Sequence, residues 1–225
     1  MSAIPVIIPV KALADAKQRL SPVLSAGDRH SLVLAMLSDV LATLSKSKSV
    51  GNILVVTPDR DVAALARAKG AGVLAETYPG GLNAAVHRGL SHSDVQRADK
   101  ALILPADVPL ATTAEITVLL EAASRRDGPR VTLAPSRDGG GTNALLLSPP
   151  DVIAPQFGPD SFVKHLAAAV ARRIDAEVIQ LPGLARDIDL PDDLSVLRQQ
   201  RMGAEPYAFL WPGSETDSAS MRTMP

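Results

Sequence analysis

The sequence predicts an α/β fold in which a mainly parallel sheet is covered by helices on both faces. Short apolar runs typical of buried strands alternate with segments whose apolar residues have helical spacing, and this order favours parallel strands joined by helices. The chain has 225 residues, of which 46% are hydrophobic, enough for a sizeable core. Ligands of such sheets bind beyond the carboxyl ends of the strands, where Lys11 and Asp107 are expected.

Local signals set the limits of the elements. Asp28 is a candidate N-cap for the first long helix, Pro58 stops a strand, and Gly70 can close a helix in the left-handed conformation. The expected elements are strand 4–10, helix 28–45, strand 53–57, helix 60–69, strand 73–75, a helix after 83, strand 101–105, helix 113–124, strands 131–134 and 143–147, helix 161–173, strand 177–181 and a helix from 192.

The length suits one large or two small domains, and no repeat or linker divides the core. We therefore expect a single domain over 1–202. The pattern fails over 203–225, where 214–225 is polar and small and is expected to form a mobile tail. The aromatic residues just before it would dock on the core or on a second subunit, which makes a homodimer one expected assembly: Tyr207, Phe209 and Trp211.

Composition excludes several classes of protein. The formal net charge of −1 argues against a general nucleic-acid or membrane-surface binder. The absence of cysteine excludes disulfides, zinc–thiolate sites and a cysteine nucleophile. No signal peptide or membrane-length apolar run is visible, so we expect a cytoplasmic protein. The four histidines show no metal-binding spacing.

Three separated aspartates are the most informative feature of the chain. Asp107 closes the apolar run 101–106, and Asp187 and Asp189 follow the run 178–181. Residues two apart in extended chain face the same way, and gathered carboxylates need a partner because unpaired charge is costly to desolvate. Magnesium would serve, and it suits phosphates. The alternative is that each aspartate is a turn or cap residue, as single aspartates often are.

A basic segment follows the first strand and includes Lys11, Lys17 and Arg19. Cations at a strand-to-helix connection can neutralise a triphosphate, and arginine can grip phosphate oxygens in bidentate fashion. The alternative is a solvated basic loop. Neither the P-loop nor the dinucleotide-binding fingerprint is present.

Gly80 and Gly81 precede Leu82 and Asn83 at the start of an expected helix. Glycines let the backbone approach a ligand closely, and asparagine can read a base or ribose while it caps the helix. An ordinary flexible loop with a cap is equally consistent with these residues.

Three successive glycines lead to Thr142 and Asn143, between two strand-like runs. An Asp-Gly pair there is a hairpin signal, but three glycines exceed what a hairpin needs and can expose backbone amides to an anion. Further along, residues 157–161 include Gly158 and Ser161 and open an amphipathic helix. A helix N-terminus attracts phosphate, although Asp160 or Ser161 can equally be a simple cap.

Together these segments resemble the 2-phospho-L-lactate guanylyltransferase family, which includes the phosphoenolpyruvate guanylyltransferases of coenzyme F420 biosynthesis. Each motif alone is weak, but the ordered set is specific and covers roughly residues 4–197. The matching stretches are VKALADAKQRLSPVL, LAMLSDVL, GLNAAV, LILPADVPL, APSRDGGGTNALLL, FGPDSFVKHLAAA and DIDLPDDL.

The resemblance implies a three-layer fold of the nucleotide-diphospho-sugar transferase type, with a mixed rather than wholly parallel sheet. It also implies GTP and Mg²⁺. It assigns the metal to Asp107, Asp187 and Asp189, with Asp107 also catalytic. It places Lys11, Lys17 and Arg19 at the GTP phosphates, the last two as catalytic residues, Leu82 and Asn83 at the nucleoside, and Thr142, Gly158 and Ser161 at the phosphate of a three-carbon acid.

The implied reaction joins GMP from GTP to that phosphate and releases pyrophosphate. Phosphoenolpyruvate is the favoured acid, with 2-phospho-L-lactate and 3-phospho-D-glycerate as alternatives. Other readings of the same residues are a cytidylyltransferase or molybdenum-cofactor nucleotidyltransferase, a metal-dependent glycosyltransferase, and a non-catalytic GTP-binding module.

Overall fold

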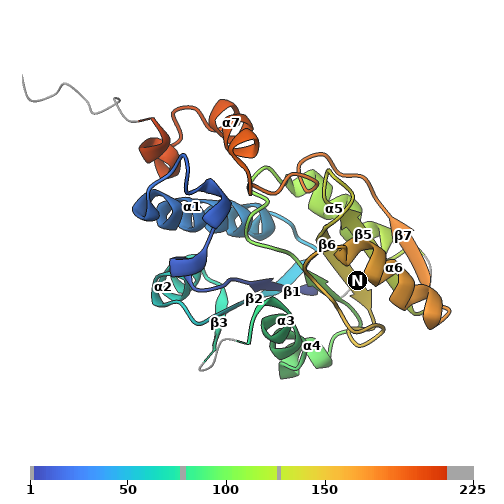
Figure 1. Ribbon diagram of the computed structural model, residues 1–225. Helices are drawn as coiled ribbons and strands as arrows, with labels where there is room; N and C mark the ends of the chain where they lie inside the picture. The colour runs from blue at the N-terminus through green and yellow to red at the C-terminus, as the bar shows by residue number, and fades with distance from the viewer. Residues whose placement is uncertain (1–2, 77–79, 126–127, 212–225) are drawn as a thin grey trace, which may run out of the picture.

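The computed structural model describes residues 3–76, 80–125 and 128–211, which form a seven-stranded sheet with helices on both faces (Figure 1). The strand order is β3-β2-β1-β4-β6-β5-β7. β6 runs antiparallel to β4 and β5, whereas the other neighbouring strands are parallel. The expected mixed, mainly parallel sheet is confirmed.

The expected strands and long helices are all present. The strands are β1 (Ile4–Pro9), β2 (Val50–Thr57), β3 (Gly72–Ala75), β4 (Ala101–Ile103), β5 (Arg130–Pro135), β6 (Thr142–Ser148) and β7 (Asp175–Val178). The α-helices are α1 (Ala26–Ser45), α2 (Arg60–Ala68), α3 (Leu82–Leu90), α4 (Ser93–Gln96), α5 (Thr113–Ala122), α6 (Ser161–Ala171) and α7 (Pro191–Gln200). The 3₁₀ helices are η1 (Leu13–Asp15), η2 (Gln18–Leu20) and η3 (Glu205–Leu210).

The two faces of the sheet pack against separate apolar clusters. Side chains alternate between the faces along a strand, so Val6 and Ile8 of β1 join the cluster under α1, α2, α5 and α7, whereas Ile7 joins the cluster under α3, α4 and α6. Gly89 lets α3 lie close to β1, because a Cβ at this position would come within 2.5 Å of Ile7 Cγ2. Within the described ranges, no helix is both long and apolar enough to cross a membrane.

The start of α1 differs from the prediction. The N-cap is Ser25, not Asp28, and Asp28 lies at the third helical position, where its carboxylate accepts from the Ser25 backbone N–H in a capping box. Both residues favour helix starts, and the reciprocal bonds between them decide which one forms the cap.

The chain after α7 packs on α1. Tyr207 in η3 is fully buried, and its hydroxyl donates to Asp39 Oδ2 over 2.9 Å. The Arg201 guanidinium donates to the same Asp39 oxygen and to the carbonyl oxygen of Pro109. Residues 201–210 therefore contact both α1 and the loop after β4, and the polar segment 212–225 lies outside the described residues.

Candidate active site

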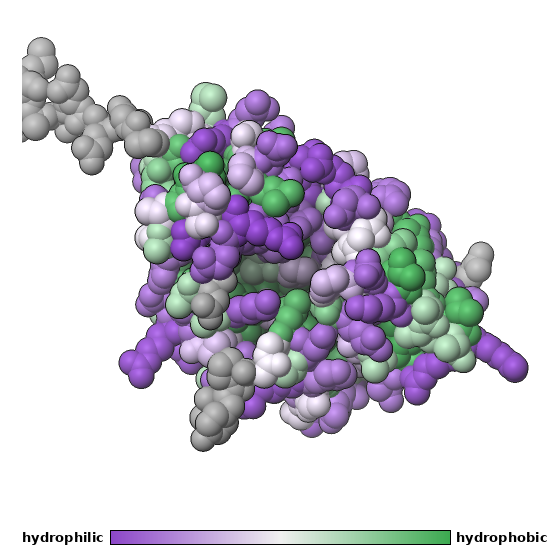
Figure 2. Space-filling view, viewed as in Figure 1, coloured by the Kyte–Doolittle hydropathy of each residue, from purple (hydrophilic) through white to green (hydrophobic). Residues whose placement is uncertain are grey.

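A cavity of about 300 Å³ lies beyond the carboxyl ends of β1 and β4. Figure 2 shows the same face of the molecule hollowed at its centre, with hydrophilic side chains along the rim. The walls of the cavity include Lys11, Lys17, Leu82, Asp107 and Asp189. Residues far apart in the chain therefore meet where ligands of parallel sheets bind.

The loop before α7 brings Asp187 and Asp189 beside Asp107. The backbone N–H of Ile188 donates to the carbonyl oxygen of Asp107 over 3.0 Å, which joins this loop to the loop after β4. Asp193 holds the loop from the other side, since its carboxylate accepts from the backbone N–H groups of Asp189 and Leu190. The three aspartates are thus brought together by backbone hydrogen bonds.

Lys17 lies between two of these carboxylates. Its Nζ is 2.7 Å from Asp107 Oδ2 and 2.6 Å from Asp189 Oδ1. Burial opposes the charge on this side chain, but the carboxylates of Asp107 and Asp189 outweigh burial and raise the pKa of Lys17. Lys17 has a left-handed backbone with φ of 51°, so the chain accepts a conformation uncommon outside glycine at this position.

Asp187 has a different environment. Its Oδ1 accepts a 3.1 Å hydrogen bond from Asn143 Nδ2, which also donates to the carbonyl oxygen of Leu184. Burial, followed by repulsion from Asp107, raises the pKa of Asp187 despite that hydrogen bond. Lys17 pairs with two of the three carboxylates and Asp187 only with an amide, which leaves an excess of negative charge.

This donor set suits a hard divalent cation, because carboxylate oxygens are its preferred ligands and the local charge is unbalanced. In the part of the chain that the structure describes, however, no three acidic or histidine side chains form a preassembled metal-binding group. The ammonium of Lys17 separates Asp107 from Asp189. A cation bound by both carboxylates would take the place of that ammonium group.

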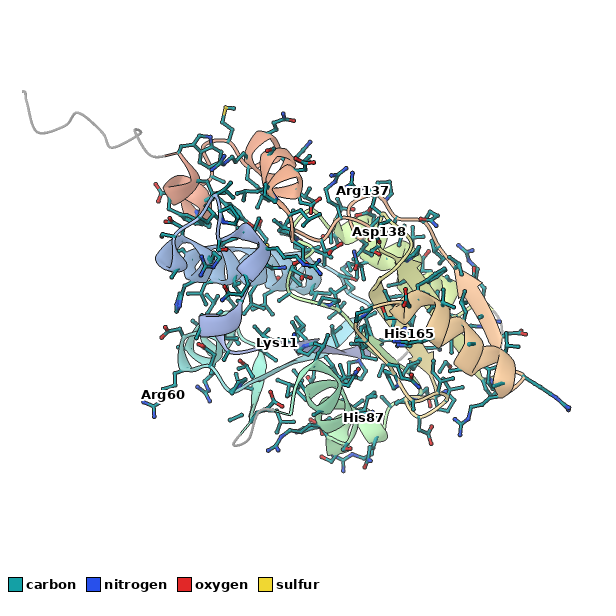
Figure 3. The ribbon with its side chains drawn as sticks, in the orientation of Figure 1. Lys11, Arg60, His87, Arg137, Asp138 and His165 are labelled. Carbon is teal, nitrogen blue, oxygen red and sulfur yellow. The ribbon has the colours of Figure 1, made fainter. Side chains whose placement is uncertain are left out.

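The other two predicted cations lie apart from the carboxylates. Lys11 follows β1, is exposed and lines the cavity, and Figure 3 labels it near the centre of the view. Arg19 is exposed on η2 and is not among the residues that line the cavity. The segment that carries all three cations is held by Asp59 at the start of α2, whose Oδ2 accepts from the Leu13 backbone N–H over 3.0 Å.

Leu82 and Asn83 begin α3 but face different neighbours. Leu82 lines the cavity. Asn83 forms two hydrogen bonds with the backbone of Phe157: its Oδ1 accepts from the N–H over 2.7 Å, and its Nδ2 donates to the carbonyl oxygen over 3.0 Å. Asn83 therefore joins the start of α3 to the loop before α6.

Thr142 and Ser161 lie side by side, 19 positions apart in the chain. The Thr142 backbone N–H donates to Ser161 Oγ over 2.9 Å, and both residues are buried. The Asp160 side chain makes no capping hydrogen bond to α6, so the simple-cap alternative for Asp160 is not observed. Gly158 has a φ of +115°, a conformation that residues other than glycine rarely adopt. Its carbonyl oxygen accepts a hydrogen bond from the Ser161 backbone N–H.

Two polar residues of this region were not predicted as functional. Asn143 holds Asp187, and His165 contacts Thr142 from α6. Both occur in the stretches that carry the family resemblance. Their position next to Thr142 and within the α6 segment is the only sequence signal for them, since side-chain polarity alone does not reveal which buried contacts they make.

A larger hollow, about 890 Å³, lies between α3, α6 and the 149–156 loop. The arginine on its wall, Arg172, already donates to the carbonyl oxygens of Asp151 and Val152. A group satisfied in this way is poorly suited to bind phosphate, so the smaller cavity with its lysines and aspartates is the better candidate site.

Solved structures support the fold. The chain is similar to a candidate nucleotide-diphospho-sugar transferase from Desulfovibrio desulfuricans, with a TM-score of 0.71 at 17% identity over 93% of this chain and 94% of that one. It is also similar to a nucleotidyl transferase from Methanothermobacter thermautotrophicus, with a TM-score of 0.65 at 16% identity over 89% and 98% of the two chains. The expected nucleotide-diphospho-sugar transferase type of fold is confirmed.

Curated relatives are closer in sequence. A phosphoenolpyruvate guanylyltransferase from Conexibacter woesei is 38% identical over 86% of each chain. A 2-phospho-L-lactate guanylyltransferase from M. thermautotrophicus is 37% identical over 91% of this chain and 88% of the relative. A 3-phospho-D-glycerate guanylyltransferase from Colwellia psychrerythraea is 38% identical over 85% and 90%.

The family model described as "Guanylyl transferase CofC like" matches residues 4–211. The match confirms the resemblance that the sequence motifs carry, and it identifies the protein as a nucleotidyltransferase enzyme. The chain belongs to the CofC-like guanylyl transferase family.

Proposed function

We propose that this protein transfers GMP from GTP to the phosphate of a three-carbon acid, with phosphoenolpyruvate as the favoured acid and pyrophosphate as the second product. The observation that carries the proposal is the meeting of Lys11, Lys17, Asp107 and Asp189 around one cavity. The names of the relatives support GTP and a phosphorylated acid as substrates.

In the proposed reaction, an oxygen of the acid's phosphate attacks the α-phosphorus of GTP. The new P–O bond forms as the bond to the β-phosphate oxygen breaks, and pyrophosphate leaves with that electron pair. The attacking phosphate is already ionised near neutral pH, so a strong general base is not needed. The main barrier is repulsion, since two unit charges about 4 Å apart repel by about 4 kcal/mol at an effective dielectric of about 20.

The cations of the segment after β1 would reduce that repulsion. Lys11 is exposed at the cavity and free to reach a phosphate, and Lys17 is held beside it by Asp107 and Asp189. Catalysis would come mainly from positioning and charge neutralisation, as in other phosphoryl transfers. Arg19, exposed on η2, would reach the outer phosphates of GTP.

We assign Mg²⁺ to Asp107, Asp187 and Asp189, whose carboxylates together exceed the charge of Lys17. When bound, the ion would neutralise the triphosphate and stabilise the departing pyrophosphate. Lys17 would then be released from Asp107 and Asp189 and would become available to the GTP phosphates. The lysine would thus hold the carboxylates in place until the cation arrives.

The acid's phosphate would bind at the N-terminus of α6. The positive end of the helix dipole and unpaired N–H groups favour an anion there, and the Asp160 side chain does not cap them. The Ser161 oxygen accepts from the Thr142 backbone N–H, which leaves the Ser161 hydroxyl hydrogen to be donated, and Thr142 Oγ1 lies 3.0 Å from His165 Nδ1. Gly158 would let the loop approach the ligand closely.

The test is pyrophosphate release from GTP with phosphoenolpyruvate, 2-phospho-L-lactate and 3-phospho-D-glycerate in turn, with the product mass determined. GMP joined to phosphoenolpyruvate is the expected product. Ser161→Ala is expected to raise the KM for the acid more than the KM for GTP, and an equal rise in both would contradict the assignment of Ser161 to the acid.

Replacing GTP by CTP in the same assay tests the cytidylyltransferase alternative, and a sugar nucleotide tests the glycosyltransferase alternative. GTP binding without consumption would indicate a non-catalytic module. The resemblance further supports a role in coenzyme F420 biosynthesis, which a deletion strain measured for F420 content would test.

A further inference from the structure

His165 is a buried polar residue that has no role in the reaction proposed above. Its side chain is inaccessible to solvent, in α6, between the helix and the sheet (Figure 3). The backbone N–H of Gln156 lies 2.9 Å from Nε2, and Thr142 Oγ1 lies 3.0 Å from Nδ1. The Phe157 ring packs edge-on, with ring centroids 5.0 Å apart.

These contacts determine the tautomer. A backbone N–H can only donate, so Nε2 must be the unprotonated acceptor. A neutral imidazole then carries its hydrogen on Nδ1, which must donate to Thr142 Oγ1. Burial lowers the pKa of His165 to about 4, which keeps the ring neutral near pH 7.

The tautomer in turn determines the direction of the Thr142 hydroxyl. Because the Thr142 oxygen accepts from Nδ1–H, its own hydrogen cannot be directed at the ring and must be donated elsewhere. The Thr142 backbone N–H is already bound to Ser161 Oγ, so the two hydroxyls are neighbours and each has its oxygen occupied by a protein donor. A phosphate dianion only accepts hydrogen bonds, and two hydroxyls with free hydrogens match it.

We propose that His165 is a positioning residue that acts through Thr142, making the Thr142 hydroxyl an obligate donor to the phosphate of the acid substrate. The proposal rests on the proposed function, in which Thr142 and Ser161 bind that phosphate. His165 itself does not touch the substrate. The Gln156 backbone N–H makes Nε2 the acceptor, and this leaves Nδ1 as the donor to Thr142.

Steady-state kinetics provide the first test. His165→Leu is expected to raise the KM for the phospho-acid by about tenfold to a hundredfold, the factor for loss of a hydrogen bond to a charged group, with the KM for GTP nearly unchanged. His165→Asn keeps an N–H donor near Thr142 and is expected to fall between His165→Leu and wild type. A merely structural role would lower kcat or stability without splitting the two KM values, and such a result would overturn the proposal.

A double-mutant cycle with Thr142→Val separates a direct from an indirect role. If His165 acts through Thr142, adding His165→Leu to Thr142→Val should change the acid's kcat/KM by less than about twofold, because the shared contact is already lost. Additive effects would contradict the mechanism.

Nitrogen-15 NMR of the imidazole in the wild-type protein tests the tautomer without any variant. Nε2 should show the shift of an unprotonated nitrogen and Nδ1 that of a protonated one at pH 7. The opposite assignment would overturn the proposal. Because this measurement needs no substrate, it distinguishes a wrong tautomer from failure of the proposed reaction, which would appear as absence of pyrophosphate release by the wild type.

Discussion

The backbone N–H of Ile188 donates a hydrogen bond to the carbonyl oxygen of Asp107 over 3.0 Å, across 81 positions of sequence. Because Ile188 lies between Asp187 and Asp189, this one bond sets both acidic residues beside the third. Ile188 itself is fully buried in the apolar cluster under α1, and the packing of its side chain fixes the position of this loop. Main-chain hydrogen bonding and apolar packing therefore bring the three carboxylates together, even though their charges repel one another.

Neutralising one carboxylate should stop turnover without unfolding the protein. Asp107→Asn and Asp189→Asn each remove one of the two ion pairs of Lys17. Each also removes one proposed ligand of the cation. We expect turnover to fall by at least about 100-fold, the scale of a lost charge-stabilising contact. Pyrophosphate release at rising Mg²⁺, alongside thermal unfolding, measures this effect. Activity close to wild type at saturating Mg²⁺ would rule out the metal role.

Lys17→Met should make the protein more responsive to Mg²⁺. Without the ammonium group, Asp107 and Asp189 repel each other and compete harder for a cation. We expect Mg²⁺ to add about 1–3 kcal/mol more stability to the variant than to wild type, seen as a rise in Tm. Turnover should fall, since Lys17 is also needed at the phosphates. The control is Lys11→Met, whose side chain is exposed, and an equal Mg²⁺ response in both variants would contradict the exchange of lysine for metal.

Asn83→Asp should impair the acid substrate first. The change keeps the oxygen that accepts from the Phe157 N–H but replaces the Nδ2 donor with an oxygen that repels the Phe157 carbonyl. The loop before α6 would shift, and we expect the KM for the acid to rise about tenfold. His87→Ala, exposed on the same helix, is the control. A rise in the KM for GTP alone would instead support direct reading of the nucleoside by Asn83.

Stability should fall in mild acid because of His165. Its pKa is about 4 in the folded protein, below the ordinary value of about 6.5 expected in the unfolded chain. Between these values the unfolded chain binds a proton that the folded protein does not, so the group destabilises the fold as pH falls from 6.5 towards 4 and contributes nothing above 6.5. The difference amounts to about 3 kcal/mol.

Urea unfolding at pH 7 and pH 4.5 measures that loss. His165→Asn removes the titrating group and should show a smaller fall in the free energy of unfolding between the two pH values. Identical pH dependence of the variant and the wild type would show that other groups account for the acid sensitivity.

The segment after α7 should be part of the stable fold up to about residue 211. Tyr207→Phe removes one hydrogen bond to Asp39 and should cost about 1 kcal/mol. A chain ended at 202 also loses the buried ring of Tyr207 and should be destabilised by about 3–5 kcal/mol relative to a chain ended at 211. Equal urea midpoints for the two truncated chains would support a domain boundary at 202.

Sequence patterns predicted the positions of the strands and helices better than they predicted how these elements are arranged next to one another. Apolar periodicity located the strands and long helices, because burial of one face is a local property of the sequence. The direction of β6 was not visible in the alternation of elements, and it followed from the family resemblance and the hairpin signal after Pro135. The Ser25 cap was missed because Ser25 and Asp28 are both good caps.

The same limit applies to the site. The aspartates were identifiable because charge after apolar runs is conspicuous in a sequence. Lys17 was expected at phosphates, but its bonds to Asp107 and Asp189 depend on tertiary packing. Asn83 was expected at the nucleoside, which stays a prediction, and its hydrogen bonds to Phe157, 74 positions away, could not be read from the sequence. Residues whose role is to hold another residue leave little trace in composition or spacing.

Strand β6, which runs antiparallel to its neighbours, fixes the distance between two parts of the proposed site. Thr142 and Asn143 are consecutive, so their side chains leave opposite faces of the sheet, one towards α6 and the other towards Asp187. Thr142, the proposed ligand of the acid's phosphate, and the acidic cluster that Asn143 contacts are thereby linked through a single peptide unit, which cannot stretch. If Thr142 binds the acid's phosphate as proposed, we expect acids of different length to be accommodated in the 155–160 loop, and changes in substrate preference to lie in that loop rather than at the start of β6.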